Sequence, residues 1–345
     1  MVIRALQYDQ FRGPLRVVEV PEPRVPAAGV VVRVGATGVC RSDWHGWQGH
    51  DPGIALPHVP GHELAGTIEA VGPDVRRWSV GDRVTVPFVC ACGSCPRCRA
   101  GDHQVCDNQT QPGFTHWGSF AELVALDAAD VNVVALPDDL SFVVAASLGC
   151  RYATSYRAVV QQGRAGAGEW VAVHGCGGVG LSAVQIAVAS GARVVAVDIS
   201  AGALQLARTL GAEAVVDGTG LPAEAVGASV RALTDGGAHV SLDALGSGPS
   251  CEASVLSLRA RGRHVQVGLV PPTVAVPMAR VVAQELELYG SHGMAAHAYP
   301  ELLALVADGR LRPDLLVTRE IGLDDAAGAL RDVGSTPGMT VITSF

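Results

Sequence analysis

Six consecutive residues within Gly38–Gly46 carry side chains that an ordinary loop does not need. The stretch GVCRSDWHG contains the thiol of Cys40, the hydroxyl of Ser42 two residues later and the imidazole of His45 five residues later. Thiolates and imidazoles are zinc ligands, and an imidazole also takes up protons near neutral pH. In a cytosolic chain we expect such a cysteine to bind metal or act in catalysis rather than to form a disulfide.

Two residues elsewhere in the chain complete a possible metal-ligand set. His62 lies in PGHELAG and Cys150 in SLGCRYATSY. Taken singly each is unremarkable, because a lone buried cysteine usually packs as a small hydrophobe. With Cys40, however, they form two thiolates and one imidazole, which is the Cys₂His pattern of a catalytic zinc with one open position. Such a zinc acts as a Lewis acid toward oxygen.

A second group of cysteines lies in one short segment, CGSCPRCRAGDHQVC, at spacings of three, three and eight residues. Four thiolates at this spacing can surround one tetrahedral Zn²⁺ and leave no position for substrate, which predicts a structural zinc. The alternatives are free or oxidised cysteines and a redox-active CxxC pair. The four predicted ligands are Cys92, Cys95, Cys98 and Cys106.

A glycine-rich turn predicts a dinucleotide site. In WVAVHGCGGVG, Gly175, Gly177 and Gly180 follow a predicted strand and open a predicted helix, with Gly178 and Val179 between the last two glycines. This register allows a tight turn, close approach of a pyrophosphate and close helix–strand packing. The next strand, RVVAVD, ends in Asp198, where a carboxylate would bind the adenosine ribose and favour NAD over NADP. The alternative is an Asp that caps a helix after an ordinary turn.

The elements that must position these residues alternate along the chain. Short Val-rich runs broken by Gly and Pro predict a β-rich region over the first ~150 residues. Repeated βα units from about residue 169 to 289 predict a doubly wound parallel sheet. We therefore expect residues 1–152 and 291–345 to form a zinc-binding catalytic domain and residues 153–290 an NAD-binding domain.

Composition excludes other functions. The 345 residues are 48% hydrophobic and carry a net charge of −8, which argues for a folded core and against nucleic acid as a partner. No apolar run is long enough to span a membrane, and MVIRALQYDQ lacks a signal-peptide core, so we expect a cytoplasmic protein. All 25 basic residues are arginines, which removes Schiff-base and Walker-type lysine chemistry.

The motifs together resemble those of the zinc-dependent alcohol dehydrogenases of the medium-chain dehydrogenase/reductase family. The resemblance is carried by GVCRSDWH, PGHE, the CGSCPRC segment, GCGGVG with Asp198, and QVGL, and it covers nearly the whole chain. It implies a partly open, GroES-like β-barrel catalytic domain joined to a Rossmann domain. It also implies reversible oxidation of a primary or secondary alcohol to an aldehyde or ketone, with NAD and two zinc ions per chain.

The resemblance also assigns roles within the opening stretch. Arg41 would meet the cofactor pyrophosphate, Ser42 would hydrogen-bond the substrate oxygen, and Asp43 would orient His62. His45 would end a proton relay that starts at Ser42.

Roles outside that stretch follow from the same resemblance. Glu63 follows His62 directly, close enough to assist or transiently replace a zinc ligand. Val267, Gly268 and Leu269 would lie near the nicotinamide amide. Trp47 and Phe88 stand where pocket-lining aromatics are expected, with ordinary core packing as the alternative.

Two other functions compete with the dehydrogenase. One is a family member that reduces a C=C or C=N bond, against which the Ser42–His45 pair argues. The other is a non-enzymatic zinc or redox sensor, in which the cofactor fingerprint would have no use. By resemblance to bacterial enzymes of this length we expect a homotetramer, with a homodimer as the alternative, acting on a small alcohol, aldehyde or ketone.

Overall fold

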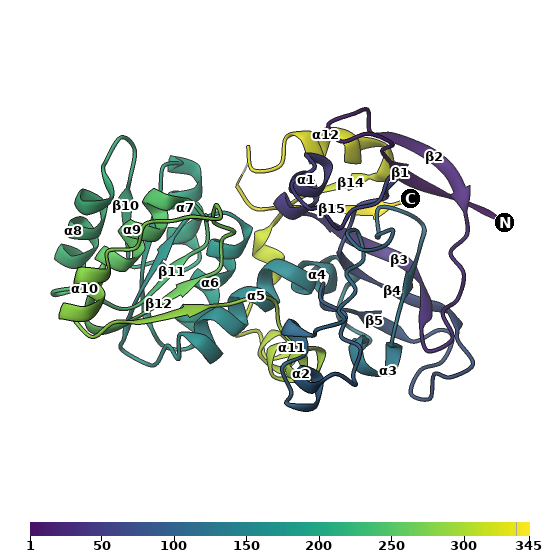
Figure 1. The fold of residues 1–345 in the computed structure, drawn as a ribbon, viewed down its shortest axis with the longest axis horizontal. Helices are drawn as coiled ribbons and strands as arrows, with labels where there is room; N and C mark the ends of the chain where they lie inside the picture. Colours follow the sequence, from purple (N-terminus) through teal and green to yellow (C-terminus); the bar gives the residue numbers. More distant parts are fainter. Residues whose placement is uncertain (336) are drawn as a thin grey trace. The chain divides into compact units, whose positions relative to one another are not determined.

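The computed structural model describes residues 1–335 and 337–345 and divides the chain into two compact units. The first unit contains Met1–Ala153, Gly293–Ala307 and Pro313–Phe345, and the second contains Thr154–His292 and Asp308–Arg312 (Figure 1). The second unit is therefore inserted into the sequence of the first. Among the described residues, no helix combines the length and apolar character needed to cross a bilayer.

The first unit is built on a mixed seven-stranded sheet in the order β14-β15-β3-β4-β5-β7, with β6 paired to β3, and on a separate β1-β2 hairpin. Its central strand β3 is buried along most of its length because β4, β6 and β15 all pair with it antiparallel. The strands are β1 (Val2–Gln7), β2 (Arg16–Pro21), β3 (Val30–Val39), β4 (Glu63–Val71), β5 (Arg83–Thr85), β6 (Leu123–Leu126), β7 (Val134–Ala135), β14 (Val317–Gly322) and β15 (Met339–Ser344).

Short helices connect these strands. The α-helices are α1 (Arg41–Trp47), α2 (Pro96–Arg99), α3 (Ala129–Asn132), α4 (Phe142–Ser147), α11 (Tyr299–Ala307) and α12 (Ala326–Arg331). Single turns of 3₁₀-helix are η1 (His103–Val105), η4 (Ala296–Ala298), η5 (Pro313–Leu316) and η6 (Leu323–Asp325), and η2 (Leu148–Tyr152) is a π-helical turn that continues α4.

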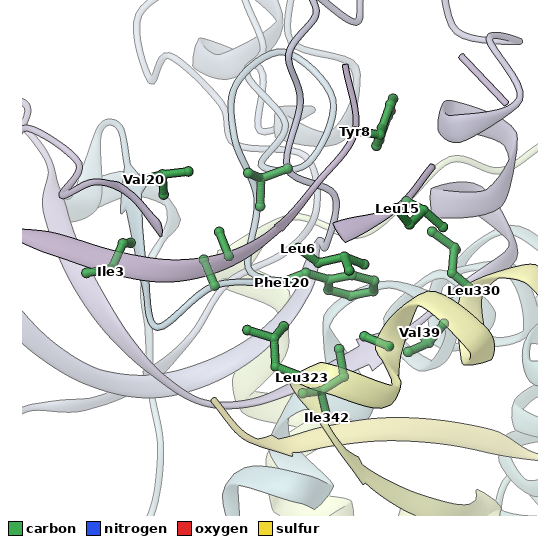
Figure 2. Close-up of a cluster of buried hydrophobic side chains, with 14 of the residues drawn as sticks. Ile3, Leu6, Tyr8, Leu15, Val20, Val39, Phe120, Leu323, Leu330 and Ile342 are labelled. Atoms are coloured by element: carbon green, nitrogen blue, oxygen red, sulfur yellow. The ribbon is translucent and has the colours of Figure 1, made fainter. Parts of the chain in front are cut away.

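A hydrophobic cluster joins the two ends of the chain within the first unit. The cluster contains three fully buried side chains, which are Leu6 of β1, Ile342 of β15 and Phe120 from the segment before β6. They pack together with Leu323 and Leu330 (Figure 2). Burial of side chains of this size contributes about 1.5–3 kcal/mol each. The cluster therefore ties the C-terminal segment to the sheet that leads into α1.

The second unit is a parallel six-stranded sheet in the order β10-β9-β8-β11-β12-β13. Numbered within the unit this order is 3-2-1-4-5-6, the doubly wound order that binds dinucleotides where the strand order reverses. All five residues of β8 are buried, as expected for a strand covered on both faces. The strands are β8 (Trp170–His174), β9 (Arg193–Asp198), β10 (Ala214–Asp217), β11 (Ala238–Asp243), β12 (Leu258–Gln266) and β13 (Glu287–Gly290).

Helices pack against this sheet and complete the expected fold. On one face, Ala172 and Val195 of the sheet pack with Val226 and Val230 of α8 and Ala253 of α9. The helices are α5 (Ala153–Tyr156), the π-helical η3 (Arg157–Gln162), α6 (Gly178–Ala189), α7 (Ala201–Thr209), α8 (Ala223–Leu233), α9 (Gly248–Leu256) and α10 (Met278–Ala283). The predicted fold class, a β-rich domain with a Rossmann domain, is confirmed.

Candidate metal centres and dinucleotide site

Three elements of the first unit bring the Cys₂His set together. Cys40 follows the last residue of β3, and His62 precedes the first residue of β4. Because β3 and β4 pair antiparallel with Gly38 opposite Glu63, the end of one strand lies beside the start of the other. Cys150 reaches the same place from the π-helical turn η2. Such turns are frequent at functional sites.

The side chains meet closely and are buried. Ligand atoms of Cys40, His62, Glu63 and Cys150 all lie within 4.8 Å of one another. The pKa of Cys40 lies well below its ordinary value, chiefly because the neighbouring Cys150 thiol hydrogen-bonds to it. Two thiols and an imidazole thus share one water-poor position.

Asp43 holds the imidazole in one orientation. Its Oδ1 lies 2.8 Å from Nδ1 of His62 and accepts a further bond from the Gly61 amide, while its Oδ2 accepts from the Cys40 amide. The Nδ1–H of His62 is therefore directed at the carboxylate, and Nε2 faces the thiols. Nε2 is buried and has no hydrogen-bond partner among the described residues. Such an orphaned nitrogen fits a zinc ligand with a carboxylate behind it.

Glu63 is held by a neighbour of the centre. Its Oε1 accepts from the backbone N–H of Arg151 at 3.0 Å and from Nε at 2.9 Å, and its Oε2 pairs with Nη2. Burial raises the pKa of Glu63, and Arg151 opposes that shift. Gly38 leaves room for the pair, since a Cβ there would lie 2.2 Å from Oε2. A bidentate buried pair of this kind keeps the carboxylate directed at the guanidinium.

The predicted pocket aromatics have different surroundings. The ring of Phe88 lies 6.1 Å from that of His62, and Phe114, which the sequence did not suggest, lies 5.2 Å from it. Trp47 instead packs against the hydrophobic cluster of Figure 2 and donates its indole N–H to the Gly13 carbonyl. Phe88 and Phe114 thus border the metal centre, whereas the contacts of Trp47 are those of core packing.

Helix α1 carries the remaining polar residues of the opening stretch. Ser42 Oγ lies 3.7 Å from Cys40 Sγ, and Ser42 and His45 are three residues apart, which places them on one helix face. Burial lowers the pKa of His45, and Arg41 and His50 lower it further. The guanidinium of Arg41 stacks on Trp44 at 5.0 Å.

The four cysteines of the other segment form a separate cluster. Their Sγ atoms lie 4.0 Å apart for Cys92–Cys98, 3.5 Å for Cys95–Cys98 and 3.8 Å for Cys95–Cys106. A zinc tetrahedron with bonds of about 2.3 Å has ligand separations of about 3.8 Å, so the cluster fits the ion. Hydrogen bonds from the Ser94 and Cys95 amides lower the pKa of Cys92 to about 5.

In the second unit, the glycine-rich turn connects β8 to α6. Gly175 has a φ of +90°, which suits glycine in a tight turn. A Cβ on Gly180 would lie 1.7 Å from the Gly175 carbonyl oxygen, so only glycine allows the helix this close. A Cβ on Gly177 would meet nothing within 4 Å. Gly178 and Val179 form the first turn of α6, where free N–H groups favour an anion.

The predicted acid and the predicted nicotinamide loop lie at the carboxyl edge of the same parallel sheet. Asp198 ends β9, and its carboxylate accepts hydrogen bonds from the amides of Cys176 at 2.6 Å and of Ile199 and Ser200 at 2.8 Å. Val267, Gly268 and Leu269 follow β12. The amides of Val267 and Gly268 donate to the Asp243 carbonyl, and Leu269 is 73% exposed. Doubly wound sheets bind dinucleotides at this edge, where the strand order reverses.

Two residues beside the predicted sites were not anticipated. Arg151 follows Cys150 directly, and an arginine within an otherwise apolar helical stretch was a signal that it pairs with a buried acid. His50 lies 2.8 Å from His45, Nδ1 to Nδ1. Its signal was a glycine, Gly49, placed to end the helix that carries His45.

Comparisons with known proteins identify the family of the chain. The family described as alcohol dehydrogenase GroES-like domain matches residues 26–138, and that described as zinc-binding dehydrogenase matches residues 178–308. An alcohol dehydrogenase of Geobacillus stearothermophilus is 38% identical over 312 residues, 90% of each chain. An NAD-dependent alcohol dehydrogenase of Sulfurisphaera tokodaii is 30% identical over 338 residues, 95% of each chain.

A solved structure extends the likeness to the whole fold. The alcohol dehydrogenase TADH from Thermus sp. ATN1 superposes with a TM-score of 0.90 at 31% identity, covering 99% of this chain and 100% of that one. Matches of this identity and coverage extend over most of the chain. The chain therefore belongs to the zinc-dependent alcohol dehydrogenases of the medium-chain dehydrogenase/reductase family, oxidoreductases that act on the CH–OH group.

Proposed function

We propose that this protein oxidises a small to medium apolar alcohol reversibly to an aldehyde or ketone, with NAD as hydride acceptor and zinc held by Cys40, His62 and Cys150. The observation that carries the proposal is the buried Nε2 of His62, which has no described partner and faces two thiols. Three protein ligands leave one position for a substrate oxygen. Phe88 and Phe114 beside His62 favour an apolar substrate.

The chain's own residues prepare and remove the proton. When bound, zinc lowers the pKa of an alcohol hydroxyl, and NAD accepts a hydride. Asp43 keeps the His62 ring in its ligating orientation. Ser42, one helical turn from His45, orients the substrate hydroxyl and accepts its proton while releasing its own hydroxyl proton toward His45, which delivers a proton outward. Arg151 holds the Glu63 carboxylate beside the ligand atoms by engaging both of its oxygens.

An NAD-linked absorbance assay tests the function. Purified protein with a panel of primary and secondary alcohols, and with the corresponding aldehydes and ketones, should show NADH formation or consumption that a zinc chelator abolishes. Activity only with C=C or C=N substrates would support the alternative reductase. No turnover with any class, together with metal-dependent binding of another macromolecule, would support the sensor.

We further propose that Cys92, Cys95, Cys98 and Cys106 bind a second, structural zinc. Cys98→Ser should lower the melting temperature by about 5–10 °C, because loss of a structural ion removes free energy of folding. The matched control is Cys251→Ser, which removes a buried thiol remote in sequence from both clusters. Differential scanning fluorimetry with elemental analysis checks this. A Cys98→Ser protein that keeps two zinc ions and the wild-type melting temperature contradicts the assignment.

His45 should control the pH dependence of alcohol oxidation. Because burial lowers the pKa of His45 below its ordinary value, the ring is neutral near pH 7 and free to accept the relayed proton. His45→Gln should therefore slow oxidation most at about pH 6–7 and least at high pH, where hydroxide takes the proton. A general base typically contributes about 10²-fold, and a relay open to solvent contributes less. The measurement is a kcat–pH profile with parallel zinc analysis; an unchanged profile or lost zinc refutes the role.

We also propose a homotetramer in the cytoplasm, with a homodimer as the alternative assembly. The nine cysteines are all free, and two clusters of them need reduced thiols to hold metal, which suits a reducing compartment. Sedimentation velocity should give a mass near four chains. A monomer with full activity contradicts the assembly.

A further inference from the structure

The histidine at the outer end of the proposed relay has a second histidine bonded to it. Nδ1 of His45 lies 2.8 Å from Nδ1 of His50, and the two ring centroids are 5.1 Å apart. At that distance one nitrogen must donate and the other accept, so the two rings share one proton between them. The remaining ring nitrogen of each histidine, Nε2, is not used by this bond.

Local backbone geometry places the pair. The His50 amide donates to the His45 carbonyl at 3.0 Å, and the Gly49 amide donates to the Gly46 carbonyl at 3.0 Å. Gly49 has a φ of +78°. These three features are those of a Schellman motif, in which the side chains at His45 and His50 come into contact. That contact is usually hydrophobic, whereas here it joins two imidazoles.

The two histidines differ in access to water. His45 is partly buried and His50 is exposed. The ring of Trp44 meets both histidines edge-on, at 5.0 Å from His45 and 5.8 Å from His50, and thereby supports their mutual orientation. A proton that reaches His45 therefore has an adjacent, solvent-facing base.

We propose that His50 is the terminal proton-exchange group of this enzyme and that His45 reaches water through it; this inference rests on the alcohol dehydrogenase function proposed above. A proton arriving at Nε2 of His45 is matched by transfer of the Nδ1 proton of His45 to Nδ1 of His50. His50 then releases its Nε2 proton to water. One proton enters and one leaves, and proton exchange with water and rotation of the exposed His50 ring restore the starting arrangement.

The charges around the pair favour outward transfer. Arg41 and His50 both disfavour the charged form of His45, and Cys40 alone among its charged neighbours favours it. Helix α12, which packs against α1, carries one charged residue, Arg331, at its last position. A proton therefore does not remain on His45, because a base for it lies 2.8 Å away.

His50→Gln tests the relay by activity. In weakly buffered solution the variant should lose on the order of tenfold in kcat for alcohol oxidation at about pH 6–7, less than a general base in contact with substrate contributes. The loss should vanish at high pH and be restored by added imidazole, with KM for NAD and zinc content unchanged. The exposed His297→Gln is the matched control and should keep the wild-type profile.

A loss of kcat that is equal at all pH values and not restored by imidazole would show a structural role for His50 and overturn the proposal. An unchanged, wild-type pH profile of His50→Gln would also overturn it. A second measurement does not depend on turnover. Ring ¹⁵N chemical shifts of the zinc-loaded protein should show one Nδ1 proton shared by the pair, and His50→Gln should shift the titration of His45. If wild type oxidises no alcohol, the proposed function fails; if the ¹⁵N shifts show two independent rings, the relay fails.

Discussion

Cys40→Ser should lower kcat/KM for alcohol oxidation by ~10³-fold or more while the protein remains folded. Zinc supplies several kcal/mol of charge stabilisation at a substrate oxygen, which corresponds to this factor. Cys40 is buried beside Cys150 and His62, and no third thiol among the described residues belongs to this group, so loss of Cys40 leaves a single thiolate ligand. Loss of the ligand should release one of the two zinc ions that we propose for each chain.

The comparison with Cys98→Ser makes the result specific. Both variants remove a buried thiol that belongs to a four-residue ligand group. Cys40→Ser should affect turnover with little change in melting temperature, and Cys98→Ser should affect melting temperature first. The test is to measure zinc content, steady-state kinetics and thermal unfolding on both variants, which shows whether the two cysteine groups differ in role. Fewer than two metal sites in a fully active wild-type preparation would defeat the division of roles.

Wild-type enzyme should prefer NAD over NADP by at least ~100-fold in kcat/KM, equivalent to about 2.7 kcal/mol. Asp198 ends the second strand of the dinucleotide fold, and three backbone amides fix its carboxylate there. A carboxylate at this position accepts bonds from a ribose diol and repels a 2′-phosphate. Ile199 beside it is 73% exposed and offers no positive charge.

Variants at these two positions test the preference. Asp198→Ala should lower the NAD/NADP ratio of kcat/KM, chiefly because NAD binds more weakly. Adding Ile199→Arg should raise kcat/KM with NADP, because a guanidinium pairs with phosphate through two hydrogen bonds. Glu224→Ala removes an exposed negative charge from helix α8 of the same unit and serves as control. Steady-state kinetics with both cofactors provide the ratio. Comparable kcat/KM for NAD and NADP in wild type would overturn the role of Asp198 and leave the zinc chemistry intact.

Glu63 shows how tertiary structure changes an expectation. Adjacency to His62 suggested a carboxylate close enough to exchange with a zinc ligand. The structure keeps it near the ligand atoms but engages both oxygens with Arg151, 88 residues away in sequence. Pairing of a buried acid with an arginine depends on which side chains the fold buries together, and no local spacing encodes that.

Local motifs, by contrast, could be predicted directly from the sequence. The CxxCxxC segment with Cys106 and the glycine turn from Gly175 to Gly180 each form their geometry within a few residues, because backbone turns and helix starts bring their members together. The strand–helix alternation likewise predicted the parallel sheet of the second unit, since periodic burial sets secondary structure directly.

The order of the amino acids was enough to predict the kinds of ligand available, the four-thiol spacing, the glycine turn and the doubly wound domain. The folded chain was needed to bring Cys40, His62 and Cys150 to one position, to pack Trp47 against the hydrophobic cluster and to pair Arg151 with Glu63. The physical reason is the range of the interactions. Hydrogen bonding and chain geometry over a few residues leave a pattern in sequence, whereas strand pairing and burial join residues whose separation in the chain carries no such pattern.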